Sequence, residues 1–346
     1  MSLGVSIVIC TYNGAARLPQ TLHYIANQNV RPGIDWEVII IDNNSSDDTD
    51  AVARQEWAKY GSSVPCLIRK QPVPGLTAAR QMGFAIALYE YVVLCDDDNW
   101  LEPDYVNTVY DIMHGNNNIG VLGGNGRLAY GEEPPSWVMY LNLLAAGPQA
   151  PASGKVSRNI VYGAGCVVRK SAYELLHRGG FEFMLSDRMG SVLTSGGDHE
   201  LCYALALAGY DIWYDDRLRF THFITRDRLT WDYYLKYIKE SSYCFYVLEP
   251  YKIMLNVPVE NMLHFRLHLI RTFLYLFRKI VMVVFKRTRM VPHSSRYKAA
   301  TLRYYILKAR LTSYSKYSLM RSNFLKVAAL KKRLHAVPPQ VIPVEA

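Results

Sequence analysis

The first hundred residues alternate short apolar runs with longer segments in which apolar residues recur at helical spacing. In chain order they predict a strand at 5–10, a helix at 15–28, a strand at 36–42, a helix at 47–60, a helix at 76–89 and a strand at 91–96. The strands lack the alternation of apolar and polar residues that is typical of a sheet with one solvent-exposed face. Both faces of the sheet should therefore be buried. We therefore predict an α/β fold with a mostly parallel central sheet and helices on both faces.

The last third of the chain has a different pattern. Residues 264–290 are largely apolar, but Arg266, Arg271, Arg278 and Lys279 interrupt them, and no uncharged stretch reaches the roughly 20 residues that cross a bilayer. The pattern favours an amphipathic helix that lies in the plane of a membrane surface. A helix packed on the rest of the protein with its basic face in water is the alternative. The following segment continues the same basic and aromatic character.

Composition and cysteine usage indicate a folded chain under reducing conditions. Half of the 346 residues are hydrophobic, which is enough for one large core or two domains of ordinary size. The six cysteines lie far apart, without a pair at zinc-binding spacing, and most of them sit inside apolar runs. This usage predicts buried thiols and a cytoplasmic chain. The first residues do not show the pattern of a signal peptide.

Charge divides the chain into two unlike parts. Residues 1–225 contain 16 Lys and Arg against 24 Asp and Glu, whereas residues 226–346 contain 23 against 6. We predict a binding and catalytic domain over the first range and a basic, aromatic, helical extension over the second. The basic part should meet an anionic partner, such as phospholipid head groups at the inner face of a membrane. It carries no recognisable nucleic-acid motif, so we expect no nucleic-acid partner.

Polar clusters follow the predicted strands directly. They are "TYNG" at 11–14, "DNNSSDD" at 42–48 and "DDDN" at 96–99. In parallel sheets covered by helices, ligands bind beyond the carboxyl ends of the strands, where these clusters fall. The first cluster can also be a plain turn, and a helix N-cap is the preferred interpretation of Asp47 and Asp48.

The three consecutive carboxylates of Asp96, Asp97 and Asp98 are the strongest chemical signal. Adjacent aspartates repel one another, and desolvation at a strand end increases that cost, so a bound cation is expected to compensate them. Oxygen ligands favour Mg²⁺ or Mn²⁺, and Mg²⁺ usually shares its coordination shell with phosphates. The cluster therefore predicts a metal and a phosphate ligand together, with a solvated turn as the alternative.

Four ordered motifs resemble the nucleotide-sugar-binding half of family 2 glycosyltransferases, which have the GT-A fold. They are "CTYNG", "VIIIDNNSSDDT", "GLTAARQMGFAIA" and "VVLCDDDNWLEPDYV". The resemblance continues through "GAGCVVRK" and "GGDHELCYALALAGYDIWYD" and covers roughly residues 5–225. It implies an enzyme that transfers a sugar from a nucleoside diphosphate sugar, with a UDP-sugar as the expected donor.

The resemblance also implies a set of donor-binding residues. They are Thr11, Tyr12, Asn13, Asp42, Asn44, Arg80, Asp96 and Asp97. Within this set, the resemblance puts Thr11 and Tyr12 at the nucleotide base, Asp42 as an acceptor of hydrogen bonds from the base, and Arg80 beside the nucleotide.

The implied metal ligands come from two places in the chain. Asp96 and Asp98 match the family's D-x-D motif, in which the last aspartate holds the divalent cation on the diphosphate. His222 resembles a histidine that some enzymes of this fold use near the metal, although a structural role among its aromatic neighbours is the alternative. The implied cofactor is Mg²⁺ or Mn²⁺.

Asp198 is the predicted catalytic base. It opens an apolar-periodic helix that ends at Gly209, so a plain N-cap is the alternative. The resemblance implies that its carboxylate takes the proton of an acceptor hydroxyl, and one base facing one leaving group implies inversion at the anomeric carbon. The family usually has a second acid just before the base, and Gly197 occupies that place here. Residues 127–160 lack periodicity and are expected to form an acceptor-side loop or to pack on themselves.

These observations lead to one hypothesis and two alternatives. The hypothesis is an inverting, metal-dependent glycosyltransferase with a glycan or lipid-linked acceptor, in surface-polysaccharide or glycolipid synthesis. One alternative is a sugar nucleotidyltransferase, although "CTYNGAARLP" offers only Arg17 for a triphosphate. The other is a catalytically silent protein that binds nucleotide-sugars or glycans. A Rossmann dehydrogenase is excluded, because no G-x-G-x-x-G follows the first strand.

Overall fold

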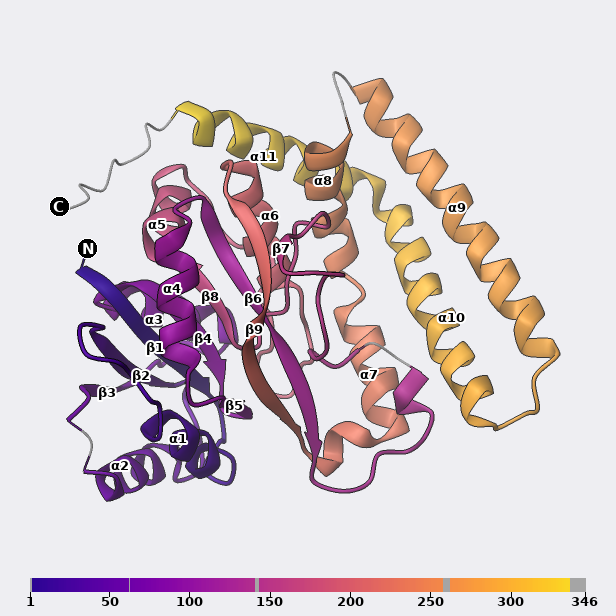
Figure 1. Ribbon diagram of the computed structural model, residues 1–346. Helices are drawn as coiled ribbons and strands as arrows, with labels where there is room; N and C mark the ends of the chain where they lie inside the picture. The colour runs from indigo at the N-terminus through magenta and orange to yellow at the C-terminus, as the bar shows by residue number, and fades with distance from the viewer. Residues whose placement is uncertain (1, 62, 141–142, 258–261, 337–346) are drawn as a thin grey trace.

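A nine-stranded sheet forms the centre of the described chain (Figure 1). The computed structural model describes residues 2–61, 63–140, 143–257 and 262–336. The main path of the sheet runs β3-β2-β1-β4-β8-β6-β9-β5, and β7 pairs with β9. The strands are β1 (Ser2–Thr11), β2 (Trp36–Asp42), β3 (Cys66–Lys70), β4 (Tyr89–Asp96), β5 (Asn99–Leu101), β6 (Ile119–Tyr130), β7 (Gly154–Lys155), β8 (Cys166–Arg169) and β9 (Asp211–Ile224).

The first four strands of this path are parallel, as the sequence predicts. β1 lies between β2 and β4, with Thr11 opposite Asp42 and Cys10 opposite Asp96. The three polar clusters therefore meet at one edge of the sheet. From β8 onward the directions are mixed, because β8 is antiparallel to both β4 and β6 while β9 is parallel to β6.

Helices cover both faces of the sheet, because successive strand residues point to opposite sides. On β1, Val8 belongs to one hydrophobic cluster, whereas Ile7 and Ile9 belong to another. Their partners on the Ile7 face come from α1 (Leu18–Ala26), α2 (Thr49–Lys59) and α4 (Tyr105–Gly115). On the Val8 face they come from α3 (Leu76–Ile86), α5 (Lys170–Arg178) and α6 (Gly197–Leu207).

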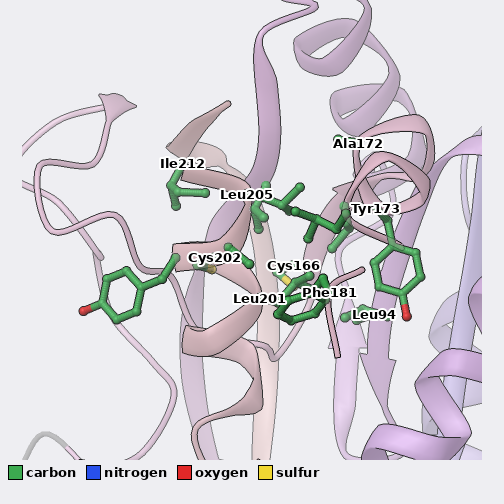
Figure 2. Close-up of a cluster of buried hydrophobic side chains, with 14 of the residues drawn as sticks. Leu94, Cys166, Ala172, Tyr173, Phe181, Leu201, Cys202, Leu205 and Ile212 are labelled. Carbon is green, nitrogen blue, oxygen red and sulfur yellow. The ribbon is translucent and has the colours of Figure 1, made fainter. Parts of the chain in front are cut away.

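Helix α6 matters for the site because it places Asp198. Figure 2 shows Leu201 and Leu205 of this helix among the buried side chains that include Leu94 of β4 and Cys166 of β8. The helix ends before Gly209, whose φ of +95° suits glycine. The first turn of α6 is therefore fixed above the sheet by its own apolar face.

The C-terminal part is helical, as predicted, and part of it joins the main core. Its helices are α7 (Trp231–Ser241), α8 (Cys244–Asn256), α9 (Met262–Thr288), α10 (Ser295–Ser313) and α11 (Tyr317–Ala336), and the chain has short 3₁₀ turns at η1 (Val138–Tyr140), η2 (Arg226–Leu229) and η3 (Tyr314–Lys316). Leu248 of α8 and Leu330 of α11 are buried with the residues of α6. Helix α9 lies farther out, beside α10 (Figure 1).

Several other predictions from the sequence can be compared with the structure. The predicted strands and helices of the first hundred residues all form, and β3 is an additional edge strand. The segment 127–160 contains the end of β6, η1 and β7 between irregular stretches, and residues 141–142 within it lie outside the described residues. All six cysteines are free, and five of them are buried. Among the described helices, none is long and apolar enough to cross a membrane.

A buried carboxylate joins three of the C-terminal helices. Glu249 of α8 accepts a hydrogen bond from Arg310 of α10 at 3.0 Å and lies 3.9 Å from His268 Nε2 of α9. Lys252 Nζ, one turn along α8, is also 3.9 Å away. Burial raises the pKa of Glu249, but His268, Lys252 and Arg310 together outweigh it and lower this pKa to about 2.

We expect Glu249→Gln to destabilise the protein at neutral pH. The lowered pKa, against the usual 4.5, corresponds to about 3 kcal/mol of stability. That stability is present above pH 4.5 and is lost as the pH falls towards 2, so the difference in Tm between variant and wild type should shrink over this range. Glu174→Gln removes a carboxylate that is 38% exposed and paired only within α5, and should change stability by less than about 1 kcal/mol. Equal Tm values for wild type and Glu249→Gln at pH 7 would contradict the assignment.

Candidate functional site

A cleft of about 610 Å³ opens at the carboxyl edge of the parallel strands. Its floor is formed by the ends of β1 and β4, and its walls include residues of α3, the first turn of α6, and helices α7, α8 and α10. The cleft therefore lies where the sequence predicts a ligand, and the C-terminal helices form part of its wall.

The middle aspartate of the triplet holds the loop that follows β1. Asp97 accepts hydrogen bonds from Thr11 Oγ1 at 2.6 Å and from Arg17 Nε and Nη2, both at 2.8 Å. Burial raises the pKa of Asp97, and Arg17 and Thr11 oppose this effect. A Cβ on Gly14 would lie 1.9 Å from Thr11 Oγ1 and 2.5 Å from Asp97 Oδ2. The glycine of "TYNG" is therefore required by the close approach of this loop to the carboxylate.

Other polar residues of the first two clusters tie their loops to each other. Asn13, with φ +48°, accepts a hydrogen bond from Ser46 N at 2.9 Å. Asp42 is buried and accepts one from Ser45 N at 2.9 Å. Asn44 is exposed with φ +59°. None of Asn13, Asp42 and Asn44 is among the described residues that line the cleft.

The last aspartate of the triplet faces His222 of β9 and Arg228 of η2, the turn that follows this strand. Arg228 Nη1 donates to Asp98 Oδ2 at 2.9 Å, and His222 Nε2 lies 3.6 Å from the same oxygen. Burial raises the pKa of Asp98, but His222 and Arg228 outweigh it and hold this pKa well below its usual range. His222 Nδ1 lies 3.1 Å from the backbone oxygen of Ala145. Asp98 is therefore ionised at neutral pH.

Arg80 lies between Asp96 on one side and Asp187 and Asp198 on the other. Its guanidinium is 3.6 Å from Asp96 Oδ1 and 3.5 Å from Asp187 Oδ2. Burial lowers the pKa of Arg80, but Asp96, Asp187 and Asp198 raise it overall. The positive charge of Arg80 is thus stabilised by carboxylates from β4, from the loop before α6 and from α6 itself.

Asp198 stands in the first turn of α6 at the cleft wall, while Gly196 occupies the N-cap position. Its Oδ2 accepts a hydrogen bond from Gly163 N and its Oδ1 one from His199 N, both at 2.9 Å. Burial raises the pKa of Asp198, but His199, Arg80 and the two amides lower it overall. A helix N-terminus also favours the charged form. The residue is an ionised carboxylate, as a general base requires.

A second carboxylate occupies the space that the missing acid would fill. Asp187 Oδ1 accepts a hydrogen bond from Gly197 N at 2.7 Å, and a Cβ on Gly197 would lie 2.4 Å from Asp187 Oδ2. Burial and the nearby charge of Asp198 raise the pKa of Asp187, which Arg80 opposes, to about 6. A side chain at position 197 and the carboxylate of Asp187 therefore exclude each other.

The structure brings most of the predicted site residues to one cleft. Those that line it are Thr11, Tyr12, Arg80, Asp96, Asp97, Asp98, Asp198 and His222. Sequence reasoning missed Arg228 and Asp187, which also line it. Both lie in segments without a repeating pattern. The signal for Arg228 was the pair of arginines in "RDR" at 226–228, shortly after the strand that carries His222.

Comparison with known proteins identifies the family. The sequence model described as Glycosyl transferase family 2 matches residues 6–176, from β1 to α5. The chain belongs to this family. Family 2 membership and the observed sheet confirm the predicted GT-A type of α/β fold with a C-terminal helical part. The family match includes the aspartate triplet and Arg80 and ends before Asp198.

Two relatives of this family 2 chain each align with less than half of it. Dolichol-phosphate mannosyltransferase of Pyrococcus furiosus is 27% identical over 143 residues, which are 41% of this chain and 38% of that protein. Chondroitin synthase of Escherichia coli is 31% identical over 120 residues, which are 35% of this chain and 17% of that protein. The chain thus spans well under half the length of either relative. Among solved structures, that of S. aureus TarS 1-349 in complex with UDP-GlcNAc aligns with 91% of this chain and 92% of its own, at 15% identity and a TM-score of 0.49.

The side chains at the cleft could bind the divalent cation that the family implies only if a ligand supplied further oxygen atoms to its coordination shell. Asp98 and His222 converge, and Asp96 is about one-third exposed nearby. Among the described residues no three acidic, histidine or cysteine side chains form a group that could hold a metal alone. Mg²⁺ commonly takes one or two carboxylates and fills its shell with water and phosphate oxygens. A metal here would compete with Arg228 for Asp98 Oδ2.

The contacts of the triplet predict different roles for its first two members. We expect Asp97→Asn to lower stability by about 2 kcal/mol or more, because it leaves Arg17 without its charged partner and weakens the bond to Thr11. Asp96→Asn, at a more exposed side chain 3.6 Å from Arg80, should cost less than about 1 kcal/mol. Urea unfolding measures both. A larger loss for Asp96→Asn would show that the assignment of roles is reversed.

Proposed function

We propose that this family 2 chain is an inverting, metal-dependent glycosyltransferase. It moves a sugar from a nucleoside diphosphate sugar, with a UDP-sugar as the first candidate, to an acceptor hydroxyl. The observation that carries the proposal is the ionised Asp198 on the wall of the same cleft that holds Asp96 and Asp98, with Arg80 between them. This arrangement offers a base on one side and a charged diphosphate site on the other.

The proposed reaction needs one proton acceptor and one direct displacement. The acceptor hydroxyl gives its proton to Asp198 as its oxygen forms a bond to the anomeric carbon. The bond from that carbon to the diphosphate breaks in the same displacement, and the nucleoside diphosphate leaves. Attack opposite the leaving group inverts the anomeric configuration. Both oxygens of Asp198 already accept one backbone amide, which fixes the orientation of the carboxylate.

Two arginines of the chain and a group of metal-binding side chains have distinct roles in the proposal. Arg80 is placed to meet the diphosphate and is kept charged by Asp96, Asp187 and Asp198. Arg228 neutralises Asp98 before the donor arrives. Asp98, with Asp96 and His222, would hold Mg²⁺ or Mn²⁺, which when bound offsets the negative charge of the diphosphate.

The sequence-based alternatives differ in how well the contacts support them. A nucleotidyltransferase would need Arg17 for a triphosphate, but this side chain is engaged by Asp97. The lack of a second acid at Gly197 would be compatible with a silent binding protein. However, Asp187 places a carboxylate beside Gly197, which favours an enzyme. We therefore favour transfer, with a glycan or lipid-linked acceptor in surface-polysaccharide or glycolipid synthesis on the cytoplasmic side of a membrane.

The donor site can be tested by thermal stability. We expect one of UDP, GDP, dTDP and CDP to raise the Tm of the wild type only when Mn²⁺ is present, because the metal and the diphosphate complete one shell. A ligand at a hundred times its Kd stabilises by about 2.7 kcal/mol. Asp98→Asn should lose this response.

A matched variant separates the metal role from a general loss of acidic charge. Asp104 is an exposed N-cap of α4 whose side chain makes no capping hydrogen bond, and Asp104→Asn should respond like the wild type. Equal stabilisation of wild type and Asp98→Asn would remove the metal role from Asp98. No response to any nucleotide would count against the donor site itself.

The base can be tested separately from donor binding. We expect Asp198→Asn to lower transfer by at least about a hundredfold, in line with the loss of general-base catalysis, while the nucleotide-induced rise in Tm is retained. Asp104→Asn again serves as the control. If the wild type shows neither sugar transfer nor slow hydrolysis of the donor, the silent binding protein is favoured. If Asp198→Asn transfers sugar as fast as the wild type, a different residue is the base.

A further inference from the structure

Helix α9 has one buried side and one exposed side along its length. Its buried residues are Phe265, Leu269 and Leu276. Phe265 and Leu269 belong to a cluster with Ile253 of α8 and Phe324 of α11, and the helix lies beside α10 at the outer edge of the molecule (Figure 1). The side that faces away from these helices is therefore open to solvent in the described part of the chain.

The exposed side of α9 is apolar rather than polar. Its residues recur at intervals of three or four, which places them on one face of a helix. They are Leu267, Ile270, Leu274, Phe277, Val281 and Phe285, each 43–59% exposed. At 1.5 Å per residue this stripe is about 27 Å long. A continuous apolar stripe of this length on a surface helix marks a contact site.

Cations border this stripe. Arg271 and Arg278 are exposed and stand three residues before and four residues after Leu274, on the same side of the helix. Beyond the last turn, the guanidinium of Arg289 lies 4.2 Å from the ring centre of Phe285. Helix α9 contains no Asp or Glu. We call the six apolar residues together with Arg271 and Arg278 the α9 outer face.

The combination of positive charge and apolar side chains on the α9 outer face favours one kind of partner over others. Two copies of α9 packed along their stripes would bring Arg271 and Arg278 close to the same residues of the other copy, without an acidic side chain on either helix to offset them. A nucleic acid would suit the arginines but not the large apolar side chains between them. An anionic lipid surface suits both, because apolar side chains enter the acyl boundary while arginines reach the head groups.

We propose that the α9 outer face docks the protein on an anionic phospholipid surface, with the helix axis in the membrane plane. The site needs no donor, metal or acceptor, so it does not depend on the proposed reaction. It has a consequence for the cleft, because Ile306 and Ala309 of α10 line the cleft and α9 packs on α10. Packed helix axes are 8–10 Å apart, so docking would bring the cleft wall within about one helix of the lipid.

Vesicle binding by the full chain tests the proposal. We expect binding to phosphatidylcholine vesicles that contain phosphatidylglycerol, much weaker binding to pure phosphatidylcholine, and a decrease with added salt. Arg271→Gln/Arg278→Gln should weaken binding by about 30-fold, from about 1 kcal/mol for each cation. Leu274→Asn/Phe277→Asn should weaken it by at least about tenfold through lost apolar burial.

Matched variants on α11 control for charge and hydrophobicity alone. Lys326→Gln/Lys332→Gln removes two exposed charges, and Leu319→Asn/Leu325→Asn removes two exposed leucines. Both should bind vesicles like the wild type, and all variants should keep the wild-type Tm because the changed side chains are exposed. Equal binding to both vesicle types, no binding, or equal loss in outer-face and control variants would overturn the proposal. A concentration-dependent dimer that the Leu274→Asn/Phe277→Asn variant abolishes would assign the face to a second copy instead.

Discussion

The site depends on the need to compensate several carboxylates that the fold brings to one edge of a parallel sheet. Three arginines from different parts of the chain meet this need. Arg17 pairs with Asp97, Arg80 lies near Asp96, and Arg228 pairs with Asp98. Without such partners, buried carboxylates would take up protons or destabilise the fold. The side chains to which the proposed function assigns the diphosphate and the metal are thus held in place by ion pairs with arginines.

This compensation also connects regions that are distant in sequence. Arg80, on α3, lies close to Asp187, in the loop before α6, and its charge lowers the pKa of Asp198. A Cβ on Gly163 would lie 3.1 Å from Asp198 Cβ and 3.2 Å from Arg80 Nη2. The glycine at 163 therefore lets Asp198 and Arg80 both approach the backbone at this position. Arg228 follows β9, within the chain's basic final third, so that part contributes charge to the site as well as packing.

The sequence predicts those features that depend on local pattern. Apolar runs identify the central strands, and the parallel arrangement brings Asp96, Asp97 and Asp98 to the expected edge. It cannot assign Asp97 to Arg17, because that pairing depends on how the loop after β1 folds back. Asp187 and Arg228 were missed since their places are set by tertiary contacts of irregular segments. The strand β3 was missed because it is short and only partly buried at the sheet edge.

Helix α10 lies between the cleft and helix α9, which carries the α9 outer face. One of its sides contributes Ile306 and Ala309 to the cleft, and another supports α9. The ion cluster around Glu249 joins α8, α9 and α10, so its contacts connect α9 to the helices of the cleft wall. If α9 is bound to a membrane surface as proposed, this link would determine how far the cleft lies from that surface. An acceptor anchored in that membrane would then meet Asp198 at a distance fixed by the packing of these three helices.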